Sequence, residues 1–414
     1  MMKENEIPQF FLCPISLQIM KNPVTTITGI TYNRESIEQW LLTSKSCTCP
    51  ITKQALPRSS EFLTPNHTLQ RLIQSWHLQN SSVSVDKIIP TSTIENLVKN
   101  LDHESLEKLL ALALENERNR TCMVEAGVAK AIIQKVIINN FFKQGKTTSL
   151  EEALRILHLI LPLAITNNDN IINNIQCYIV DDNFDLVNSL TLILQLHIDN
   201  KNFKVINEAM IVLKLIFEVK NSTSLVNLNV DFFREIVKVL RIRNKALSIK
   251  AMKSALHVLL QTCPLGRNRL KIVEAGAVKE IIDLALEKQE KNQTELIFMV
   301  LADLCCCADG REQFVQHAAG IAVISKRTLR VSSTTDDCAL QIFCLISKYC
   351  ATNDVVQEML RVGAVSKLCM VMQADCGSYL KEKARGVLRL HSNVWNNSPC
   401  IQVYLLTRHQ RFGE

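Results

Sequence analysis

Several residues near the N-terminus of this chain are of types that could bind a zinc ion. The candidate zinc ligands there are Cys13, Cys47, Cys49 and His67. Structural zinc sites use four Cys or His ligands, commonly paired at Cys-x-x-Cys spacing, yet Ser16 occupies the position where a partner of Cys13 would stand. Cys47 and Cys49 are separated by one residue instead of two. This set is too small for two tetrahedral sites, so we expect neither a metal nor another cofactor.

Cys13 is also a candidate nucleophile, because a thiolate can form covalent intermediates. A reactive thiolate needs a neighbour that lowers its pKa, such as a histidine, and no histidine lies near Cys13 in the sequence. We expect Cys13 to be a buried structural residue. The charged start of the chain lacks the apolar core of a signal peptide, so we expect a cytoplasmic protein without disulfides. Most of the 15 cysteines, including Cys305, Cys306 and Cys307, should then pack in the core.

Short elements must hold two irregular loops, residues 13–18 and 47–54. Residues 24–31 are typical of a β-hairpin with Gly29 at its turn. Asn33 and Asn66 precede two amphipathic helical patterns, where an asparagine side chain can cap the helix. The apolar faces of the two patterns are Ile37, Trp40 and Leu41, then Leu69, Leu72, Ile73 and Trp76. The region is therefore predicted to be a small α+β domain.

The ordered motifs FxCPISLxxM, NPV, GxTYxR, IExW, CPxTK and LTPNxxLxxLIxxW resemble the U-box over residues 10–76. The resemblance implies a zinc-free, RING-like fold that binds a ubiquitin-conjugating enzyme (E2) carrying ubiquitin, with no covalent intermediate and no catalytic residue on the ligase. The E2-contact positions of the family match Ile15, Trp40 and Pro50. Lys53 matches the basic linchpin that touches both E2 and ubiquitin. The structural positions match Cys13, Pro14, Tyr32 and Trp76.

Some assignments keep alternatives open. Pro50 can simply shape its loop, since proline restricts the backbone. Trp40 can belong to the core, although Ile37 and Leu41 can supply that face, which favours an exposed contact for Trp40. The sequence departs from the usual U-box where acids are common, at Gln18, Asn22 and Asn33. Each change removes a possible charge-assisted hydrogen bond, although an amide oxygen can still accept one.

Residues 93–395 are helical and repetitive. Similar segments surround Gly127, Gly276, Gly320 and Gly363, and the last three glycines are spaced by 320 − 276 = 44 and 363 − 320 = 43 residues. This period matches the roughly 40–47 residues of armadillo and HEAT repeats. The glycine is expected to end one helix in a left-handed conformation. Residues 140–250 lack the glycine but keep the helical period, so we interpret them as degenerate repeats.

Armadillo repeats stack into a groove that binds a partner, here expected to be a protein substrate. We expect the helix after each glycine to line this groove, with Lys130, Lys279, Lys326 and Lys367 near it. A net charge of +7 with only 5% aromatic residues does not indicate nucleic-acid binding. The most apolar run, residues 156–165, is shorter than the roughly 20 residues that a bilayer requires, so no membrane span is expected.

The whole chain resembles a plant U-box/armadillo subgroup of E3 ubiquitin ligases linked to stress and immune signalling, most closely at residues 263–278, 301–314 and 394–400. The predicted fold is a small α+β, zinc-free, RING-like U-box followed by an all-α armadillo superhelix. The predicted segments are the U-box at 6–80, a linker at 81–92, the repeats at 93–395 and a loosely ordered tail at 396–414. The implied function is transfer of ubiquitin from E2 to a lysine of a bound substrate. The U-box could also join two copies of the chain into a homo-oligomer. The alternative is an armadillo scaffold whose U-box is weak or inactive.

Overall fold

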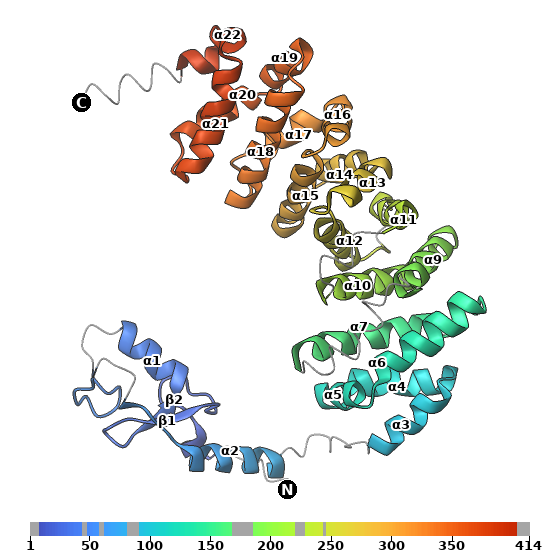
Figure 1. Ribbon diagram of the computed structural model, residues 1–414. Coiled ribbons are helices and arrows are strands. Elements are labelled where there is room, and N and C mark those ends of the chain that lie inside the picture. The colour runs from blue at the N-terminus through green and yellow to red at the C-terminus, as the bar shows by residue number, and fades with distance from the viewer. Residues whose placement is uncertain are drawn as a thin grey trace. The chain divides into compact units, whose positions relative to one another are not determined.

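The computed structural model describes residues 8–43, 48–57, 62–80, 91–167, 185–219, 228–242 and 246–403. The chain divides into two compact units, Met1–Ile88 and Ile89–Glu414 (Figure 1). This division falls inside the predicted linker, of which residues 81–90 lie outside the described residues. Residues 91–92 already belong to the first helix of the second unit.

The first unit is the predicted small α+β domain. Its antiparallel sheet has the strand order β2 (Thr31–Asn33), β1 (Pro23–Thr25) and β3 (Thr64–Pro65), and Val24 of β1 faces Tyr32 of β2. The hairpin prediction is confirmed, because Gly29 lies between β1 and β2 with a φ of 77°. The elements are η1 (Gln9–Phe11), β1 (Pro23–Thr25), β2 (Thr31–Asn33), α1 (Arg34–Thr43), β3 (Thr64–Pro65) and α2 (His67–Asn80).

The two asparagines that precede the helices act differently. Asn66 caps α2 as predicted, since its Oδ1 accepts the backbone N–H of Leu69 at 3.0 Å. Asn33 was predicted to cap α1, and this prediction is wrong. Its Oδ1 instead accepts the N–H groups of Lys21 and Asn22, because Asn33 is the last residue of β2 and faces the preceding loop.

A small apolar core joins the helices and the sheet to both loops. Cys13 of the first loop and Cys49 of the second are both fully buried in it. Trp76 of α2 lies edge-on to Phe11, with 5.6 Å between the ring centroids. Pro14 is exposed, so its structural contribution is the restricted backbone of its loop and not core packing. The other core residues are Met20, Val24, Tyr32, Ile37, Leu41, Leu56, Leu63 and Ile73.

The second unit is all-helical. Its first half contains α3 (Thr91–Asn100), α4 (His103–Glu115), α5 (Glu117–Glu125), α6 (Val128–Ala131), the π-helix η3 (Ile132–Lys143), α7 (Leu150–Asn167), α9 (Asp185–Asp199), α10 (Phe203–Val219) and α11 (Val230–Arg241). Its second half contains α12 (Ile249–Thr262), α13 (Gly266–Glu274), α14 (Ala277–Leu286), α15 (Lys291–Leu304), α16 (Ala308–Gln316), α17 (Gly320–Arg327), α18 (Ser333–Tyr349), α19 (Asn353–Arg361), α20 (Ala364–Gln373), α21 (Ser378–Leu390) and α22 (Ser392–Trp395).

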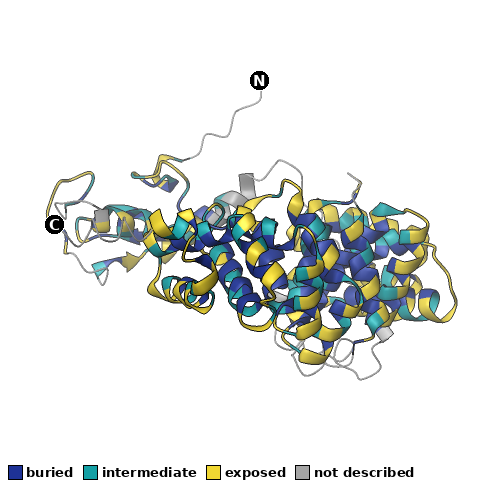
Figure 2. Cartoon of the chain, turned by 90° about the horizontal axis from the view of Figure 1, so that it is seen from above, coloured by how far each residue is buried: buried dark blue, intermediate teal, exposed yellow. Residues whose placement is uncertain are grey.

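These helices stack in parallel layers around one continuous core that extends from Ile94 to Trp395. In one layer α7, α10, α12, α15, α18 and α21 pack against each other in that order, and they form the inner side of the curved stack (Figure 1). The helices that follow the glycines, such as α14, α17 and α20, form another layer. Figure 2 shows buried residues on the facing sides of the helices and exposed residues on their outer sides.

This arrangement corrects the predicted groove. The helix after each glycine does not line the inner side of the stack. The longer helix that comes next in the chain, for example α15 after α14, occupies that place. Lys279 and Lys326 are exposed, but they belong to α14 and α17 in the other layer. The sequence pattern shows that a helix is amphipathic, yet it cannot show on which side of the stack its polar face lies.

The repeat glycines have two physical roles. Gly127, Gly276 and Gly363 have φ values of 70°, 83° and 77°, which confirms the left-handed conformation predicted for them. The same prediction is wrong for Gly320, which is the first residue of α17 and has no positive φ. A Cβ at Gly320 would lie 2.4 Å from the carbonyl oxygen of Phe314, so close helix packing requires glycine there.

The cysteine triplet and the C-terminal segment also differ from expectation. Cys305 is buried at the end of α15, but Cys306 is exposed in the turn before α16, so the triplet as a whole is not a core segment.

Residues 396–403, predicted to be loosely ordered, pack on the repeat core through Cys400 and Ile401. Residues 404–414 lie outside the described residues. No helix in the described ranges combines the length and apolarity that crossing a bilayer demands.

Candidate functional site

The first loop of the small unit is a tight turn closed by backbone hydrogen bonds. The N–H of Cys13 donates to the carbonyl of Gln18, and the N–H of Leu17 donates back to the carbonyl of Cys13, both at 2.8 Å. Leu17 adopts a left-handed φ of 55°. An isolated antiparallel bridge between Leu12 and Ile19 joins the two ends. The loop is therefore defined by its own backbone.

The second loop repeats this construction. The N–H of Cys49 donates to the carbonyl of Gln54 at 2.8 Å, and the N–H of Lys53 donates to the carbonyl of Cys49 at 3.0 Å. Lys53 occupies the left-handed position with a φ of 60°, and Thr48 pairs with Ala55. Each loop thus starts with a buried cysteine and contains a left-handed residue four positions later. The sequence alone showed two loops but not that they have the same structure.

A cysteine sulfur accepts hydrogen bonds inside each loop. Sγ of Cys13 accepts the N–H of Asn33 at 3.3 Å. Sγ of Cys49 accepts the hydroxyl of Tyr32 at 3.0 Å and the N–H of Thr52 at 3.4 Å. The hydroxyl of Thr28 also donates to Cys49, at 3.5 Å.

These donors shift the pKa values of both thiols. Burial raises the pKa of Cys49, but the hydrogen bonds from Thr28, Thr52 and Tyr32 outweigh it and lower the value to about 6. Burial likewise raises the pKa of Cys13, and backbone donors led by Asn33 lower it overall. The pKa of Tyr32 rises, chiefly through burial and then through its hydrogen bond to Cys49. Within the described residues no three His, Cys, Asp or Glu side chains converge as a metal ion would require.

The predicted contact residues surround these loops. Ile15 and Pro50, one in each loop, are half-buried, and Lys53 is exposed. Trp40 of α1 is half-buried as well and packs against the core, while its Nε1 donates to the carbonyl of Thr48 at 3.0 Å. The indole therefore supports the start of the second loop and is only partly exposed, so its packing on the core is observed while its contact with E2 stays a prediction.

Two apolar residues at this surface were missed by the sequence reasoning. Leu17 is 75% exposed next to Ile15, and Ile51 is 52% exposed next to Pro50. A signal was available, because an apolar residue in a tight loop has no helical or strand face through which to reach a core. Together they enlarge the apolar surface that the loops present to solvent.

The sequence departures leave the described loop contacts in place. The amide oxygen of Asn33 accepts two backbone N–H groups, at 3.1 Å from Lys21 and 3.0 Å from Asn22. The carbonyl of Asn22 accepts the N–H of Arg34 at 2.9 Å, which joins this loop to the start of α1. Gln18 contributes its backbone carbonyl to the first loop, while its side chain is exposed. An amide thus performs the acceptor role expected of an acid at position 33.

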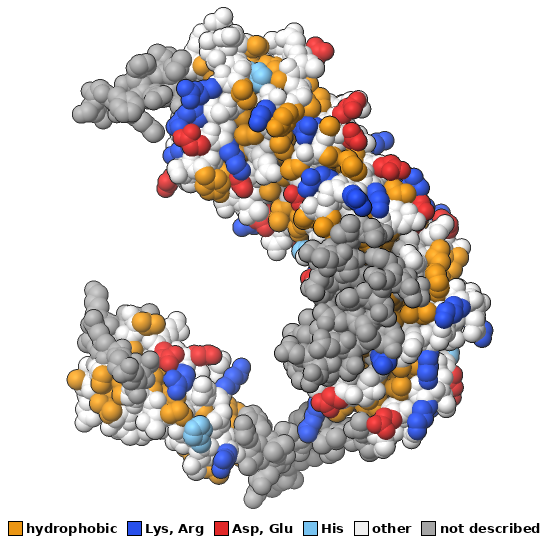
Figure 3. Space-filling model, viewed as in Figure 1, with side chains coloured by type: hydrophobic (Ala, Val, Ile, Leu, Met, Phe, Trp, Pro, Cys, Tyr) orange, Lys and Arg blue, Asp and Glu red, His pale blue; other side chains and the backbone are white. Residues whose placement is uncertain are grey.

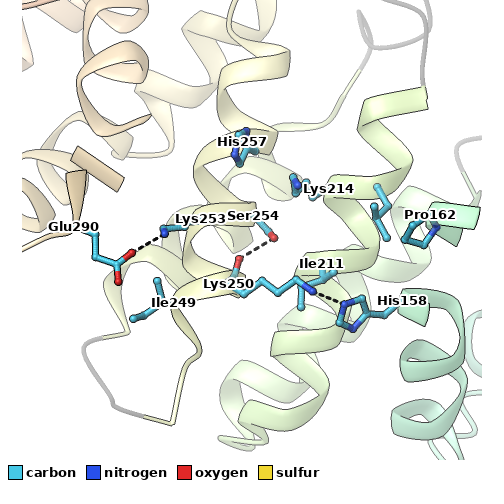
Figure 4. A pocket seen from close by; sticks show the side chains of 11 residues that line it. His158, Pro162, Ile211, Lys214, Ile249, Lys250, Lys253, Ser254, His257 and Glu290 are labelled. Carbon is cyan, nitrogen blue, oxygen red and sulfur yellow. Dashed lines mark hydrogen bonds and ion pairs between the residues drawn. The ribbon is translucent and has the colours of Figure 1, made fainter. Parts of the chain in front are cut away.

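The second unit has a pocket of about 650 Å³ on its inner layer, across α7, α10 and α12 (Figure 4). A polar chain crosses it: Nζ of Lys250 lies 2.6 Å from Nε2 of His158, whose Nδ1 lies 2.7 Å from Glu208. Lys253 donates to Glu290 at 2.8 Å on the other side. Apolar side chains of Pro162, Ile211, Leu215 and Ile249 complete the lining.

The repeat surface is electrostatically mixed. On the face shown in Figure 3, Lys and Arg side chains are interspersed with Asp and Glu. Several are paired across a turn or between repeats, for example Arg234 with Asp231 and with Glu274. The described residues on this face form no single-signed stripe of the kind that marks a nucleic-acid surface.

Comparisons with known proteins agree with both units. The family model described as the U-box domain matches residues 7–82, and the one described as the plant U-box protein ARM repeat region matches residues 84–411. The E3 ubiquitin-protein ligase PUB23 of Arabidopsis thaliana is 42% identical over 414 aligned residues that cover 96% of each chain. PUB24 from the same plant is 38% identical and covers 98% of this chain and 96% of its own.

A solved structure supports the fold of the repeats alone. The crystal structure of Uso1-2 aligns with 75% of this chain and 51% of its own at a TM-score of 0.53 and 10% identity. The fold, the twin loops and the near full-length relatives lead to one assignment. The chain belongs to the plant U-box proteins with armadillo repeats, and it is an E3 ubiquitin ligase of the RING type.

Proposed function

We propose that the two loops of the U-box bind an E2 that carries ubiquitin, and that this promotes direct transfer of ubiquitin to a substrate lysine. The observation that carries this proposal is the paired construction of the loops. Each presents a half-buried apolar residue, Ile15 or Pro50, beside a strongly exposed one, Leu17 or Ile51. Apolar residues that lie exposed in this way mark protein-binding surfaces. Trp40 adds its exposed edge to the same surface.

Lys53 is proposed to act as the linchpin that contacts both E2 and ubiquitin. It is exposed, and it adopts a left-handed backbone conformation near the end of the second loop. A thioester-linked ubiquitin is mobile, and many of its orientations keep the thioester away from an attacking lysine. Holding ubiquitin in one orientation raises the fraction of complexes ready to react, which is a proximity effect. The ligase then needs neither a base nor a nucleophile of its own.

The test is ubiquitin chain formation by the full-length protein with E1, a panel of E2 enzymes, ubiquitin and ATP. Ile15→Ala should abolish most of the activity, because it removes the apolar contact of the first loop. Leu72→Ala is the matched control, since Leu72 is equally apolar and 51% exposed but lies on α2. If no E2 of the panel supports chains, the protein is instead an armadillo scaffold with an inactive U-box.

We propose further that the inner layer of the repeats holds the protein substrate. The pocket across α7, α10 and α12 supports this, because it combines apolar side chains with Lys250 and Lys253 on one open surface. Ile249→Glu should reduce modification of a protein that the wild-type chain ubiquitinates, while ubiquitin discharge to free lysine stays unchanged. Equal loss of both activities would contradict a role in substrate binding.

Two further proposals concern the cell. The free thiols of the described residues support a reducing compartment, the cytoplasm. The resemblance of residues 263–278, 301–314 and 394–400 to a plant subgroup linked to stress and immune signalling leads us to propose a part in that signalling. Fractionation of plant cells tests the first, and the response of a loss-of-function plant to a pathogen elicitor tests the second. Association of two copies through the U-box is tested by light scattering of the full-length chain.

A further inference from the structure

The strand β2 contacts both loops of the U-box through neighbouring residues. The side chain of Tyr32 donates to the sulfur of Cys49 in the second loop, and the backbone N–H of Asn33 donates to the sulfur of Cys13 in the first. Consecutive Cα atoms are about 3.8 Å apart, so one short piece of strand sets the spacing between the two loops.

We propose that Cys49 and Tyr32 are positioning residues of this ligase, which hold the second loop in register with the first through strand β2. The inference rests on the proposed function of the loops in E2 binding. It concerns residues that contact neither E2 nor ubiquitin, since both side chains are fully buried. Their effect would be exerted through Pro50 and Lys53.

The first argument is that hydrogen bonds from three separate segments meet at the sulfur of Cys49. Thr28 belongs to the turn of the hairpin, Tyr32 to strand β2, and Thr52 to the loop itself. A zinc ion in a structural site likewise joins separate segments through its ligands. Here one buried acceptor gathers the donors instead, and removing it would leave the buried hydroxyl of Tyr32 without this partner.

The second argument is that Cys49 is tied to Lys53 by the backbone. The carbonyl of Cys49 accepts the N–H of Lys53, while its sulfur accepts the N–H of Thr52 one residue earlier. The left-handed conformation of Lys53 costs free energy in a residue with a side chain, so the surrounding hydrogen bonds must maintain it. Pro50 directly follows Cys49 in the chain. Both proposed contact residues of this loop are therefore tied to Cys49 itself, Pro50 by the peptide bond and Lys53 by a backbone hydrogen bond.

The third argument is electrostatic. Two titratable side chains of the same core interact in this network. Tyr32 acts on the sulfur of Cys49, and Cys13 acts on Tyr32. A buried polar atom is stabilised only while its hydrogen-bond partners stay in place, which makes such a network sensitive to the loss of any one of them. Tyr32 donates the shortest of the three hydrogen bonds, so its hydroxyl is the most informative group to remove.

The test uses full-length Tyr32→Phe, which removes one oxygen atom and keeps the ring in the core. Ubiquitin discharge from E2 to free lysine is measured at increasing E2 concentration, together with thermal unfolding. A displaced second loop should lower the maximal rate through Lys53 and raise the E2 concentration needed for half that rate through Pro50. We expect a combined loss of roughly tenfold, the size that one buried hydrogen bond can supply.

The matched control is Thr31→Val, on the neighbouring residue of the same strand. The hydroxyl of Thr31 pairs with that of Thr25 at 2.9 Å, on the opposite face from Tyr32. Loss of that pair should leave both kinetic values unchanged. Cys49→Ser provides the second comparison, because serine keeps an acceptor at this position and should retain more activity than Cys49→Ala.

The outcomes separate this inference from the function on which it rests. If wild-type protein discharges no E2, the proposed function fails. If wild type is active and Ile15→Ala is not, but Tyr32→Phe and Cys49→Ala both keep wild-type rates at every E2 concentration, only the positioning role is overturned. The positioning role would likewise be overturned if the rate of Tyr32→Phe fell only in proportion to the fraction of unfolded protein. Positioning predicts that the folded variant itself reacts more slowly.

Discussion

The U-box and the armadillo repeats are stabilised by different kinds of contact. The U-box loops are closed by a few directed hydrogen bonds, several of them to Cys13 and Cys49, around one small core. The repeats share a continuous apolar core in which each helix packs on its neighbours in the stack. Directed bonds position a few contact residues accurately, whereas a repeated core tolerates local variation along its length. The glycine signature can therefore be lost between residues 140 and 250 while the stack continues.

The comparison predicts that a core defect in the repeats lowers stability without changing the chemistry of the U-box. Trp395 is fully buried, and its Nε1 donates to the carbonyl of Val356 at 3.2 Å. Trp395→Ala should destabilise the repeat unit by about 3–5 kcal/mol, as large aromatic truncations in cores do. Calorimetry should show this, while discharge of E2 to free lysine stays at the wild-type rate. Val394→Ala, at an exposed neighbour, should change neither measurement.

A polar defect in the U-box should have a smaller energetic effect but a direct functional one. Asn33→Ala removes the acceptor of two backbone N–H groups, those of Lys21 and Asn22. We expect a loss of about 1–3 kcal/mol in the stability of the first unit, together with reduced chain formation. Asn33→Asp keeps the acceptor and adds charge, so it should be at least as stable as wild type. A destabilised Asn33→Asp protein would show that the amide group makes a contact which a carboxylate cannot replace.

The two units should respond to pH in opposite directions. The pKa of Cys49 is lowered from 9.0 to about 6, so its stabilisation is complete above pH 9 and is lost as pH falls towards 6. Cys263 directly follows the last residue of α12, and burial raises its pKa to about 12. Its contribution to the stability of the repeats is therefore complete below pH 9 and is lost as pH rises towards 12.

Calorimetry of the full chain between pH 6 and 10 measures this difference. The U-box should gain on the order of 1–2 kcal/mol from pH 6 to 7.5, and the repeats should lose stability only above pH 9. Cys49→Ser is the control, because serine does not titrate in this range and should flatten the response of the U-box. Parallel curves for the two units in the wild-type protein would contradict the opposite pKa shifts.

The smallest effect is expected for exposed ion pairs on the repeats. Arg361 pairs with Glu358 at 2.5 Å, three residues apart on α19, and its side chain is 74% exposed. Water and salt screen such a pair, so Arg361→Ala should leave the stability of the repeats nearly unchanged. The melting temperature at low and high salt checks this. A larger loss at low salt alone would indicate a more extended charge network along α19.

Much of the site was predictable because its signals are local. The hairpin, both helices and the left-handed conformation of three of the four repeat glycines follow from residue types at short spacings, and the structure confirms them. The contact roles of Ile15, Pro50 and Lys53 stay predictions. Leu17 and Ile51 were overlooked because exposure in a loop depends on which way the backbone turns, and a hydrophobicity pattern does not contain that information.

The sequence by itself determined the kinds of unit and their order, since ligand spacing, helical periodicity and the repeat length are properties of neighbouring residues. Only the tertiary structure decided which helices form the inner layer, why Gly320 must be glycine and why Asn33 faces a loop instead of a helix. It also decided that Cys13 and Cys49, which at first were candidate metal ligands, accept hydrogen bonds from one strand. Those features depend on atoms brought together from distant parts of the chain, and a pattern of neighbouring residues does not contain them.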